Sequence, residues 1–417
     1  MNPPKRRPTP WAAEVSAAPA AGLLRQALAL SLGAAVSLGL ARFSYALLLG
    51  PMRADLGWSY FTAGLMNTSN AAGYLLGALL MPWLMARVGP RAAMLGGALA
   101  TAVLLALHGL VLSDAALLAL RLASGAASAA TFVAGGLLAA RLGGQTLAAG
   151  GGRLNAGLVL GLYYGGTGLG IVASALLVPA VEQLGRAHGW LPAWWVLGAT
   201  ALLFSGLMAR GTAADAPAPP GQQGAAALPW RRLAWALAGY GCFGLGYIGY
   251  MTFIVSLLRE QQLAGGLITA FYVTLGLGVM ASSWLWAGLL QRWRGGQAMA
   301  LLNALLALAT LLPVLSSHPL AVFGSGALFG AVFLSVVAST TALVRHNLPA
   351  AAWARGISAF TIVFAIGQIA GPSLVGLIAD GAGGLARGLA LSAALLALGA
   401  LLAACQRPLS LPPPSSR

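Results

Sequence analysis

Residues 210–232 read RGTAADAPAPPGQQGAAALPWRR and form the one long polar interruption in an apolar chain of 417 residues. Proline, glycine, glutamine and alanine dominate this stretch, and such a composition is typical of a flexible linker. The stretch lies at the middle of the chain, with long apolar runs before and after it. Its position predicts two halves of similar size joined by a linker.

Composition places both halves in a membrane. Hydrophobic residues make up 59% of the chain and charged residues 7%, and the mean hydropathy is +0.84. This is the profile of a polytopic membrane protein, in which abundant glycine lets helices approach closely. The two cysteines, Cys242 and Cys405, each lie in an apolar run, so we predict no disulfide framework, no metal site and no cofactor.

Apolar runs of about 20 residues, the length that crosses a bilayer, divide the chain into twelve predicted spans. Each half contains six of them. Their ranges are 25–50, 61–85, 92–112, 116–140, 154–181, 191–209, 233–257, 268–290, 297–316, 320–344, 356–379 and 384–405.

Positive charge orients these spans. The formal net charge is +16, but the arginines occur singly and in pairs between apolar runs, which indicates topology rather than nucleic-acid binding. One alternating set of segments, both tails included, carries most of them, whereas the opposite loops hold only Arg53, Arg186, Arg259 and Arg387. We therefore predict that both termini are cytoplasmic. A chain rich in Ala, Gly, Arg and Pro with one lysine also suggests a GC-rich bacterium, hence the cytoplasmic (inner) membrane.

The predicted organisation is a cytoplasmic tail over 1–24, a six-helix bundle over 25–209, a cytoplasmic linker over 210–232, a second six-helix bundle over 233–405 and a cytoplasmic tail over 406–417. An internal repeat supports it. At an offset of about 205 residues, GLARFSY (39–45) lies over GLGYIGY (244–250), so that Arg42 corresponds to Tyr247. Matches of this kind are the signature of parallel structural repeats.

Twelve spans, a central cytoplasmic loop and six-plus-six repeats resemble the major facilitator superfamily over nearly the whole chain. Three strings are similar to its YbfB/YjiJ-like group: ARFSYALLLGPMRADLGWSYFTAGLMNTSNAAGYLLGALL from residue 41, LGYIGYMTFIV in span seven and AIGQIAGPSLVGLIAD in span eleven. The resemblance implies an all-α fold of two six-helix parallel repeats. It also implies that spans one, four, seven and ten line a central cavity. We further predict that the protein is not an enzyme, because no predicted span contains a metal-ligand cluster, a carboxylate pair or a nucleophile with a neighbouring base.

The same resemblance implies a set of residues that act in gating. The loop between spans two and three, MARVGPR, supplies Arg87, Gly89 and Arg91, although Ala86 occupies the position at which the superfamily normally has an acidic residue. GLYYGGTGLG in span five, with Gly161, Gly165 and Gly170, is similar to a glycine-rich motif of the superfamily. In span eleven the second copy of this motif contains Gly371 and Pro372.

Two arginines lie inside predicted spans. Arg42 is eight residues from Gly50, or about 12 Å inside its helix at about 1.5 Å per residue, and Arg121 lies at a similar depth in span four. An arginine near the centre of a membrane helix costs roughly 2.5–3.5 kcal/mol, which favours a compensating cavity, partner or substrate. Two guanidiniums at one level, with no carboxylate inside any span, predict a site for an anion. Two alternatives compete with an anion site. Arg42 could bond helix-end carbonyls, and either arginine could extend its side chain to the membrane interface.

Polar and aromatic side chains on the predicted inner faces complete the candidate site. The predicted substrate-binding residues besides the two arginines are Tyr45, Asn67, Asn70, Tyr74, Tyr247, Tyr250 and Gln368. Each of them has a structural alternative, since polar side chains in membranes often simply bond a neighbouring helix.

A secondary transporter that works by alternating access is the leading functional prediction, with a small organic anion as substrate. Protons could drive transport through Asp55 paired with a buried arginine or through the acid group of the substrate. The third alternative is transport without proton coupling. A multidrug or toxic-compound efflux pump and a non-transporting sensor or scaffold are the competing functions. The predicted partners are a small-molecule substrate, membrane lipid and, in the coupled case, protons, but no nucleic acid.

Overall fold

The computed structural model describes residues 20–148, 156–182, 188–212 and 229–409. Most of the predicted linker and most of both predicted tails lie outside these residues. Within them, twelve helices are long and apolar enough to cross a membrane. The prediction of an all-α protein with twelve spans is therefore confirmed, and every predicted span falls on one of these helices.

The first six spans run from residue 20 to residue 211. Their elements are α1 (Ala20–Ala34), η2 (Ala35–Phe43) and α2 (Tyr45–Leu56), which together form span one, then α3 (Tyr60–Val88), α4 (Pro90–His108), α5 (Asp114–Ala148), α6 (Ala156–Glu182) and α7 (Trp190–Gly211). The last six are α8 (Trp230–Glu260), α9 (Gly265–Leu285) with the short α10 (Ala287–Arg292), α11 (Gln297–Leu315), α12 (Pro319–Asn347), α13 (Trp353–Ala379) after the short η3 (Ala350–Ala352), and α14 (Gly384–Ala404).

Local sequence signals set several of the helix ends. The hydroxyl of Ser59 accepts a hydrogen bond from the backbone N–H of Thr62, which caps the start of α3. Pro90 opens α4, where its missing N–H is harmless. Gly89, between α3 and α4, has a φ of 81°, a conformation that a side chain would strain. The predicted gating residue Gly89 thus has a demonstrable conformational reason to be glycine.

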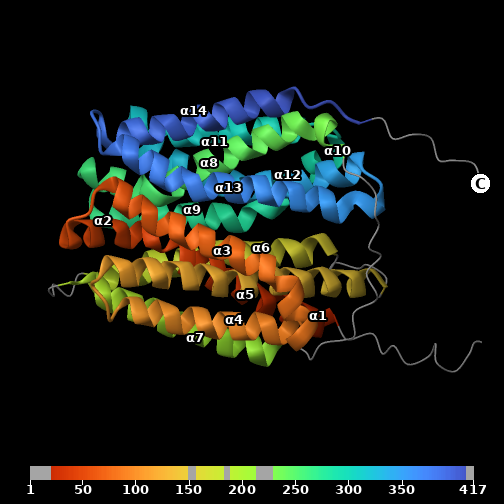
Figure 1. The fold of residues 1–417 in the computed structure, drawn as a ribbon, viewed down its shortest axis with the longest axis horizontal. Coiled ribbons are helices and arrows are strands. Elements are labelled where there is room, and N and C mark those ends of the chain that lie inside the picture. Colours follow the sequence, from red (N-terminus) through yellow and green to blue (C-terminus); the bar gives the residue numbers. More distant parts are fainter. Residues whose placement is uncertain (1–19, 149–155, 183–187, 213–228, 410–417) are drawn as a thin grey trace, which may run out of the picture.

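The helices form two bundles that lie side by side (Figure 1). One contains α1 to α7 and the other α8 to α14, and they meet along α6 with α9, along α3 with α13, and where α2 contacts α8. In the view of Figure 1, α4 and α7 lie at one edge of the molecule and α11 and α14 at the other. Spans three, six, nine and twelve therefore stand outside, as the family resemblance implied.

Burial singles out two spans as central. The most apolar window of span one is 94% buried and that of α8 is 83% buried, whereas the corresponding windows of the remaining spans are at most 50% buried. Spans one and seven are thus enclosed by protein on nearly all sides. A buried polar side chain in either of these windows therefore faces other helices rather than lipid.

Close backbone contact holds span one in place. A Cβ built on Gly39 would lie 2.5 Å from the Cα atom of Gly170 in α6, and one built on Gly168 would lie 2.3 Å from the carbonyl oxygen of Gly276 in α9. Only glycine permits approaches of this kind. Gly170 therefore lets α6 pack closely against span one, and Gly168 lets α6 pack closely against α9 of the second bundle.

We name the two ends of the bundles by the orientation that the arginine distribution predicts. The predicted outer end is the one at which α2 ends and α3 begins, near the α2 label in Figure 1. The opposite end is the predicted cytoplasmic end.

Candidate functional site

The centre of span one is a π-helix rather than an α-helix. Element η2 covers Ala35–Phe43, and the backbone N–H of Ser44 donates to the carbonyl of Gly39, five residues earlier, at 3.1 Å. All nine side chains of η2 are buried. Short π-helical segments inside α-helices occur frequently at functional sites, because the additional residue in the turn redirects side chains and leaves carbonyl groups available.

Two of the carbonyl groups near the end of this segment bind side chains of other helices. The carbonyl of Ala41 accepts a hydrogen bond from Nη1 of Arg121 at 3.0 Å, and that of Phe43 accepts one from the hydroxyl of Tyr272 at 2.6 Å. Arg121 belongs to the first bundle and Tyr272 to the second. The irregular segment is therefore held from both halves of the molecule.

Arg42, at the end of the π-helix, is buried but its guanidinium is largely unpaired. The residue is 3% exposed, and neither Nε nor Nη2 has a hydrogen-bond partner among the described residues. The guanidinium lies over the ring of Tyr74 in α3, 5.8 Å from the ring centroid. A buried cation with unsatisfied donors is costly, so such a group is by default a candidate functional residue.

Arg121 has very different surroundings. Its Nε donates to the carbonyl of Met66 at 3.3 Å, its Nη1 to Ala41 as described, and its Nη2 to Oδ1 of Asn67 at 3.2 Å. The guanidinium also lies 4.7 Å from the ring centroid of Tyr45. All three of its nitrogens thus bond groups of the first bundle. That Arg121 binds substrate stays a prediction, but its present contacts join three helices.

Asn67 extends this network into the second bundle. Its Nδ2 donates to Oγ1 of Thr252 in α8 at 2.7 Å, and Thr252 in turn donates to the carbonyl of Ile248. Asn70, one turn further along α3, remains inside the first bundle and donates to the carbonyl of Arg121. The two asparagines that the sequence singled out therefore differ, because only Asn67 links the halves.

Aromatic rings gather at the same level in the second bundle. Tyr240, Phe243 and Tyr247 of α8 and Phe364 of α13 stack with centroid separations of 4.8–5.5 Å and interplanar angles of 17–24°. We call these four residues the aromatic stack. Tyr247 also faces Phe333 of α12 at 6.1 Å.

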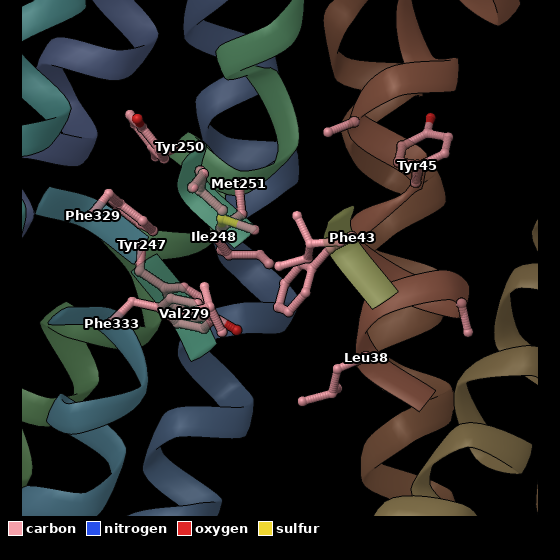
Figure 2. Close-up of a cluster of buried hydrophobic side chains, with 14 of the residues drawn as sticks. Leu38, Phe43, Tyr45, Tyr247, Ile248, Tyr250, Met251, Val279, Phe329 and Phe333 are labelled. Atoms are coloured by element: carbon pink, nitrogen blue, oxygen red, sulfur yellow. The ribbon is translucent and has the colours of Figure 1, made fainter. Parts of the chain in front are cut away.

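Figure 2 shows how span one meets this region: Phe43 reaches from its ribbon toward Ile248, Tyr247 and Phe333. The rings of Phe43 and Phe333 make an edge-on contact at 5.8 Å. In the predicted repeat, Phe43 and Ile248 occupy equivalent positions, one residue after Arg42 and Tyr247. Equivalent residues of two repeats approach each other only near the axis that relates the repeats, so this is the centre of the molecule.

Tyrosine side chains and one amide lie near Arg42 in both bundles. In the first bundle, Phe132 contacts both Tyr74, whose ring lies under the guanidinium, and Tyr164 of α6. In the second bundle, Phe333 contacts both Phe43, the residue after Arg42, and Tyr247. The hydroxyl of Tyr247 donates to Oε1 of Gln368 in α13 at 3.1 Å. Five residues, which come from five helical elements and from both bundles, make up what we call the Arg42 site: Arg42, Tyr74, Tyr164, Tyr247 and Gln368.

The structure thus brings together four of the predicted substrate-binding residues and places others elsewhere. Arg42, Tyr74, Tyr247 and Gln368 belong to the Arg42 site. The hydroxyl of Tyr45 donates to the carbonyl of Ala63 at 2.9 Å, and that of Tyr250 lies 2.6 Å from Oγ of Ser325. The sequence prediction missed Tyr164 and the ring of Phe364. In the part of the chain that the structure describes, no three His, Cys, Asp or Glu side chains come together as a metal site requires.

The hydrogen bonds that link described residues of the two bundles gather in the predicted outer half. Asp380, after α13, accepts from the backbone N–H groups of Tyr60 and Phe61 at 2.6 and 2.9 Å and so caps α3 from the other bundle. The hydroxyl of Tyr60 also donates to Glu260. Arg259 pairs with Glu182 at 3.2 Å and donates to the carbonyl of Leu47.

A cavity of about 670 Å³ adjoins this last ion pair between α6 and α9. Leu47, Glu182, Arg259, Leu263 and Ile268 are among the residues that line it. None of the residues of the Arg42 site does, so the cavity is separate from that site.

The coupling candidate Asp55 and two predicted gating arginines bond within the first bundle. Oδ2 of Asp55 accepts from Nε1 of Trp190 at 2.6 Å and lies 2.5 Å from Nδ1 of His188, rather than beside a buried arginine. Arg91 donates to the carbonyl of Ala209 at the end of α7, and Arg87 lies over the ring of Trp83.

The glycines predicted to act in gating sit where helices meet. A Cβ built on Gly161 would lie 3.0 Å from Nε1 of Trp284 in α9, and one on Gly165 would lie 3.5 Å from the carbonyl of Met280 in the same element. Gly371 of α13 packs on Leu245 and Ile248 of α8, and the carbonyl of Pro372 faces Gly64 of α3. Their gating role stays a prediction.

Comparison with known proteins gives results at three levels. The family model described as "uncharacterised MFS-type transporter YbfB" matches residues 34–404. The chain is 30% identical over 348 residues to a chloramphenicol resistance protein of Streptomyces lividans, and the match covers 81% of this chain and 85% of that protein.

Among solved structures, the fold is similar to a bacterial homologue of the human lysosomal transporter Spinster in an inward-facing, unoccupied conformation. That match has a TM-score of 0.64 and 14% identity, and it covers 92% of this chain and 95% of the other. The nucleoside transporter NupG matches with a TM-score of 0.66 and 12% identity, over 91% of this chain and 98% of the other. Both similarities concern the fold alone.

Proposed function

The chain belongs to the YbfB-type family of major facilitator superfamily transporters, and from this premise we propose that it carries a small organic anion across the bacterial cytoplasmic membrane by alternating access. The family makes it a multi-pass membrane transporter of a small molecule. The anionic substrate, the membrane and the orientation with both termini in the cytoplasm are the proposed part.

The unpaired guanidinium of Arg42 is the observation that carries the anion assignment. It lies on the most enclosed span, at the contact between the two bundles, and two of its donors have no partner among the described residues. A negatively charged substrate group would satisfy both donors and neutralise the charge. Charge-assisted hydrogen bonds of this kind are the strong ones, and Arg suits them through its planar fork of donors.

The distribution of contacts between the bundles supports alternating access. Hydrogen bonds between described residues of the two bundles gather in the predicted outer half, so this conformation is closed on that side. Rocking of the two bundles about the Arg42 site would break these contacts and form others at the opposite end. The moving bodies in this proposal are residues 25–209 and 233–405, joined by the linker over 210–232.

Asp55 is the candidate group for proton coupling, and the acid group of the substrate is the alternative. The carboxylate of Asp55 contacts the imidazole of His188, so a proton gained or lost there changes a contact at the predicted outer end. Coupling through Asp55 predicts that Asp55→Asn abolishes the response of uptake to a pH gradient while uptake without the gradient continues. Coupling through the acid group of the substrate predicts that the response persists.

Uptake by the purified protein in proteoliposomes tests the main proposal. A panel of carboxylates, phosphates and cationic drugs is compared with and without a pH gradient. We expect uptake of an anion that falls at least about tenfold in Arg42→Ala and is unchanged in Arg231→Ala, because Arg231 is an exposed arginine at the start of α8. Intact anion uptake by Arg42→Ala, or a cationic substrate, would contradict the proposal.

Export of toxic compounds is the second candidate, favoured by the relative from Streptomyces lividans that is named a chloramphenicol resistance protein. Chloramphenicol carries no acid group, so its recognition would not need the charge of Arg42. Expression of the chain in a drug-sensitive bacterium decides between the candidates: chloramphenicol resistance that survives Arg42→Gln would favour this function over anion transport.

A further inference from the structure

The identity of the unpaired atoms in Arg42 narrows the class of anion. Nε and Nη2 are the two nitrogens without a partner among the described residues, and they lie on the same edge of the guanidinium. Their N–H groups point in parallel, at the spacing of the two oxygens of a carboxylate. The free edge is therefore suited to one planar acid group bound through two hydrogen bonds.

The free donors beside this edge are enough for one acid group. The other buried arginine, Arg121, already donates to Met66, Ala41 and Asn67 through all three of its nitrogens. Carboxylates of the described residues lie at the predicted outer end, as in Asp380 and Glu260, and not beside Arg42. One guanidinium edge with free donors binds one acid group, because each nitrogen of Arg121 already makes a hydrogen bond.

Aromatic side chains form the rest of the surroundings. Tyr247 belongs both to the Arg42 site and to the aromatic stack, and it faces Phe333, which contacts Phe43, the residue after Arg42. Phe364 in the stack is only partly buried, as are Tyr74 and Tyr164 in the first bundle. The first bundle adds Phe132, whose ring lies 5.9 Å from that of Tyr164 and 6.4 Å from that of Tyr74. Partly buried rings thus lie in both bundles, and the ring of Tyr74 lies under the guanidinium itself.

From this arrangement we propose that the substrate is an aromatic monocarboxylate, whose acid group binds Nε and Nη2 of Arg42 and whose ring packs on Phe364 and Tyr247. The inference rests on the proposed function, because it names the substrate class of the same site. Ring-on-ring contacts add specificity beyond the burial of apolar area, and an aliphatic ring of equal size lacks them.

Binding to the purified full-length protein tests the inference with benzoate and cyclohexanecarboxylate as probes. The two anions have the same charge and similar size, but only benzoate has an aromatic face. We expect benzoate to bind about tenfold more tightly than cyclohexanecarboxylate. Phe364→Leu should reduce this ratio at least about threefold, and Phe329→Leu, which alters a ring stacked on Tyr250 in the same bundle, should leave it unchanged.

Each outcome has a distinct meaning. Equal binding of the two anions, lost in Arg42→Gln, would overturn the aromatic assignment and leave the organic-anion proposal standing. Absence of binding by both anions would overturn the aromatic assignment alone, and binding that Arg42→Gln does not weaken would overturn both proposals. Because the ratio of the two affinities in the unmodified protein is itself decisive, the test does not depend on whether the Phe364→Leu protein folds.

Discussion

Asp380 holds the two bundles together at the predicted outer end, and removing its carboxylate should shift the protein toward a conformation open on that side. Its two oxygens accept the backbone N–H groups of Tyr60 and Phe61, which belong to the other bundle. Both N–H groups are at the first turn of α3, where the helix offers no internal acceptor. Asp380→Ala removes both contacts without touching the Arg42 site.

The size of the effect follows from these two hydrogen bonds. A hydrogen bond to a charged group contributes about 1.5–3 kcal/mol when it is buried, but Asp380 and Phe61 are exposed, and solvent screening reduces such contributions to about 1 kcal/mol or less. The pair therefore favours the closed state by up to about 2 kcal/mol. Its loss should raise the ratio of open to closed protein by up to about thirtyfold.

Distances between spin labels on the two bundles measure this ratio. The labels are placed at Ala54→Cys and Ala264→Cys, two exposed alanines at the predicted outer end, after Cys242 and Cys405 have been replaced by serine. In Asp380→Ala we expect a second, longer distance that is scarce or absent in the parent protein.

Asp114→Asn is the matched control for this experiment, because Asp114 lies at the same end but accepts its hydrogen bond from Trp58 within the first bundle. Its distance distribution should match that of the parent. The reasoning would be refuted if Asp380→Ala left the distribution unchanged, or if Asp114→Asn altered it as strongly.

Two further predictions concern stability. Arg121→Gln should lower the free energy of unfolding by about 2–4 kcal/mol, since three hydrogen bonds are lost or weakened in a buried site. Arg42→Gln should not lower it, because this change removes an unpaired buried charge. Thermal unfolding in detergent compares the two variants, and a larger loss of stability in Arg42→Gln would contradict the assignment. Gly39→Ala should sharply reduce the yield of folded protein, because the new Cβ would lie 2.5 Å from the Cα of Gly170. Gly22→Ala should be tolerated, because a Cβ at this position has nothing within 4 Å. Equal yields of the two variants in size-exclusion chromatography would count against the packing argument.

The sequence predicted the membrane fold well because one physical quantity, apolar length, decides it. Twelve runs long enough to cross a bilayer correspond to the twelve helices, and the central position of span one and α8 agrees with what the family resemblance implied. The π-helix at Ala35–Phe43 was not predicted, since a local change from i−4 to i−5 hydrogen bonding leaves the apolar pattern intact. Helix ends that extend beyond the apolar core, as at Trp230 and Ala148, were also missed.

The sequence predicted the charged residue of the site, but it did not predict all of the aromatic residues around it. Arg42 is conspicuous in the sequence because a cation in an apolar run is costly. Tyr164 and Phe364 are not, because aromatic residues in a span are usually packing residues. The bonds that distinguish Arg121 from Arg42 go partly to backbone carbonyls, which no sequence pattern reveals. The contact of Asp380 with Tyr60 depends on how the two bundles meet, which helix patterns do not specify.

The central claim is that the guanidinium of Arg42 binds the acid group of the substrate, and the affinities of benzoate and its neutral counterpart benzamide test it most directly. The two ligands share a ring and nearly the same size, so their difference isolates the charge. We predict that the unmodified protein binds benzoate at least about thirtyfold more tightly than benzamide, and that Arg42→Gln reduces this preference to about threefold or less. A preference for benzoate that persists undiminished in Arg42→Gln would contradict the claim.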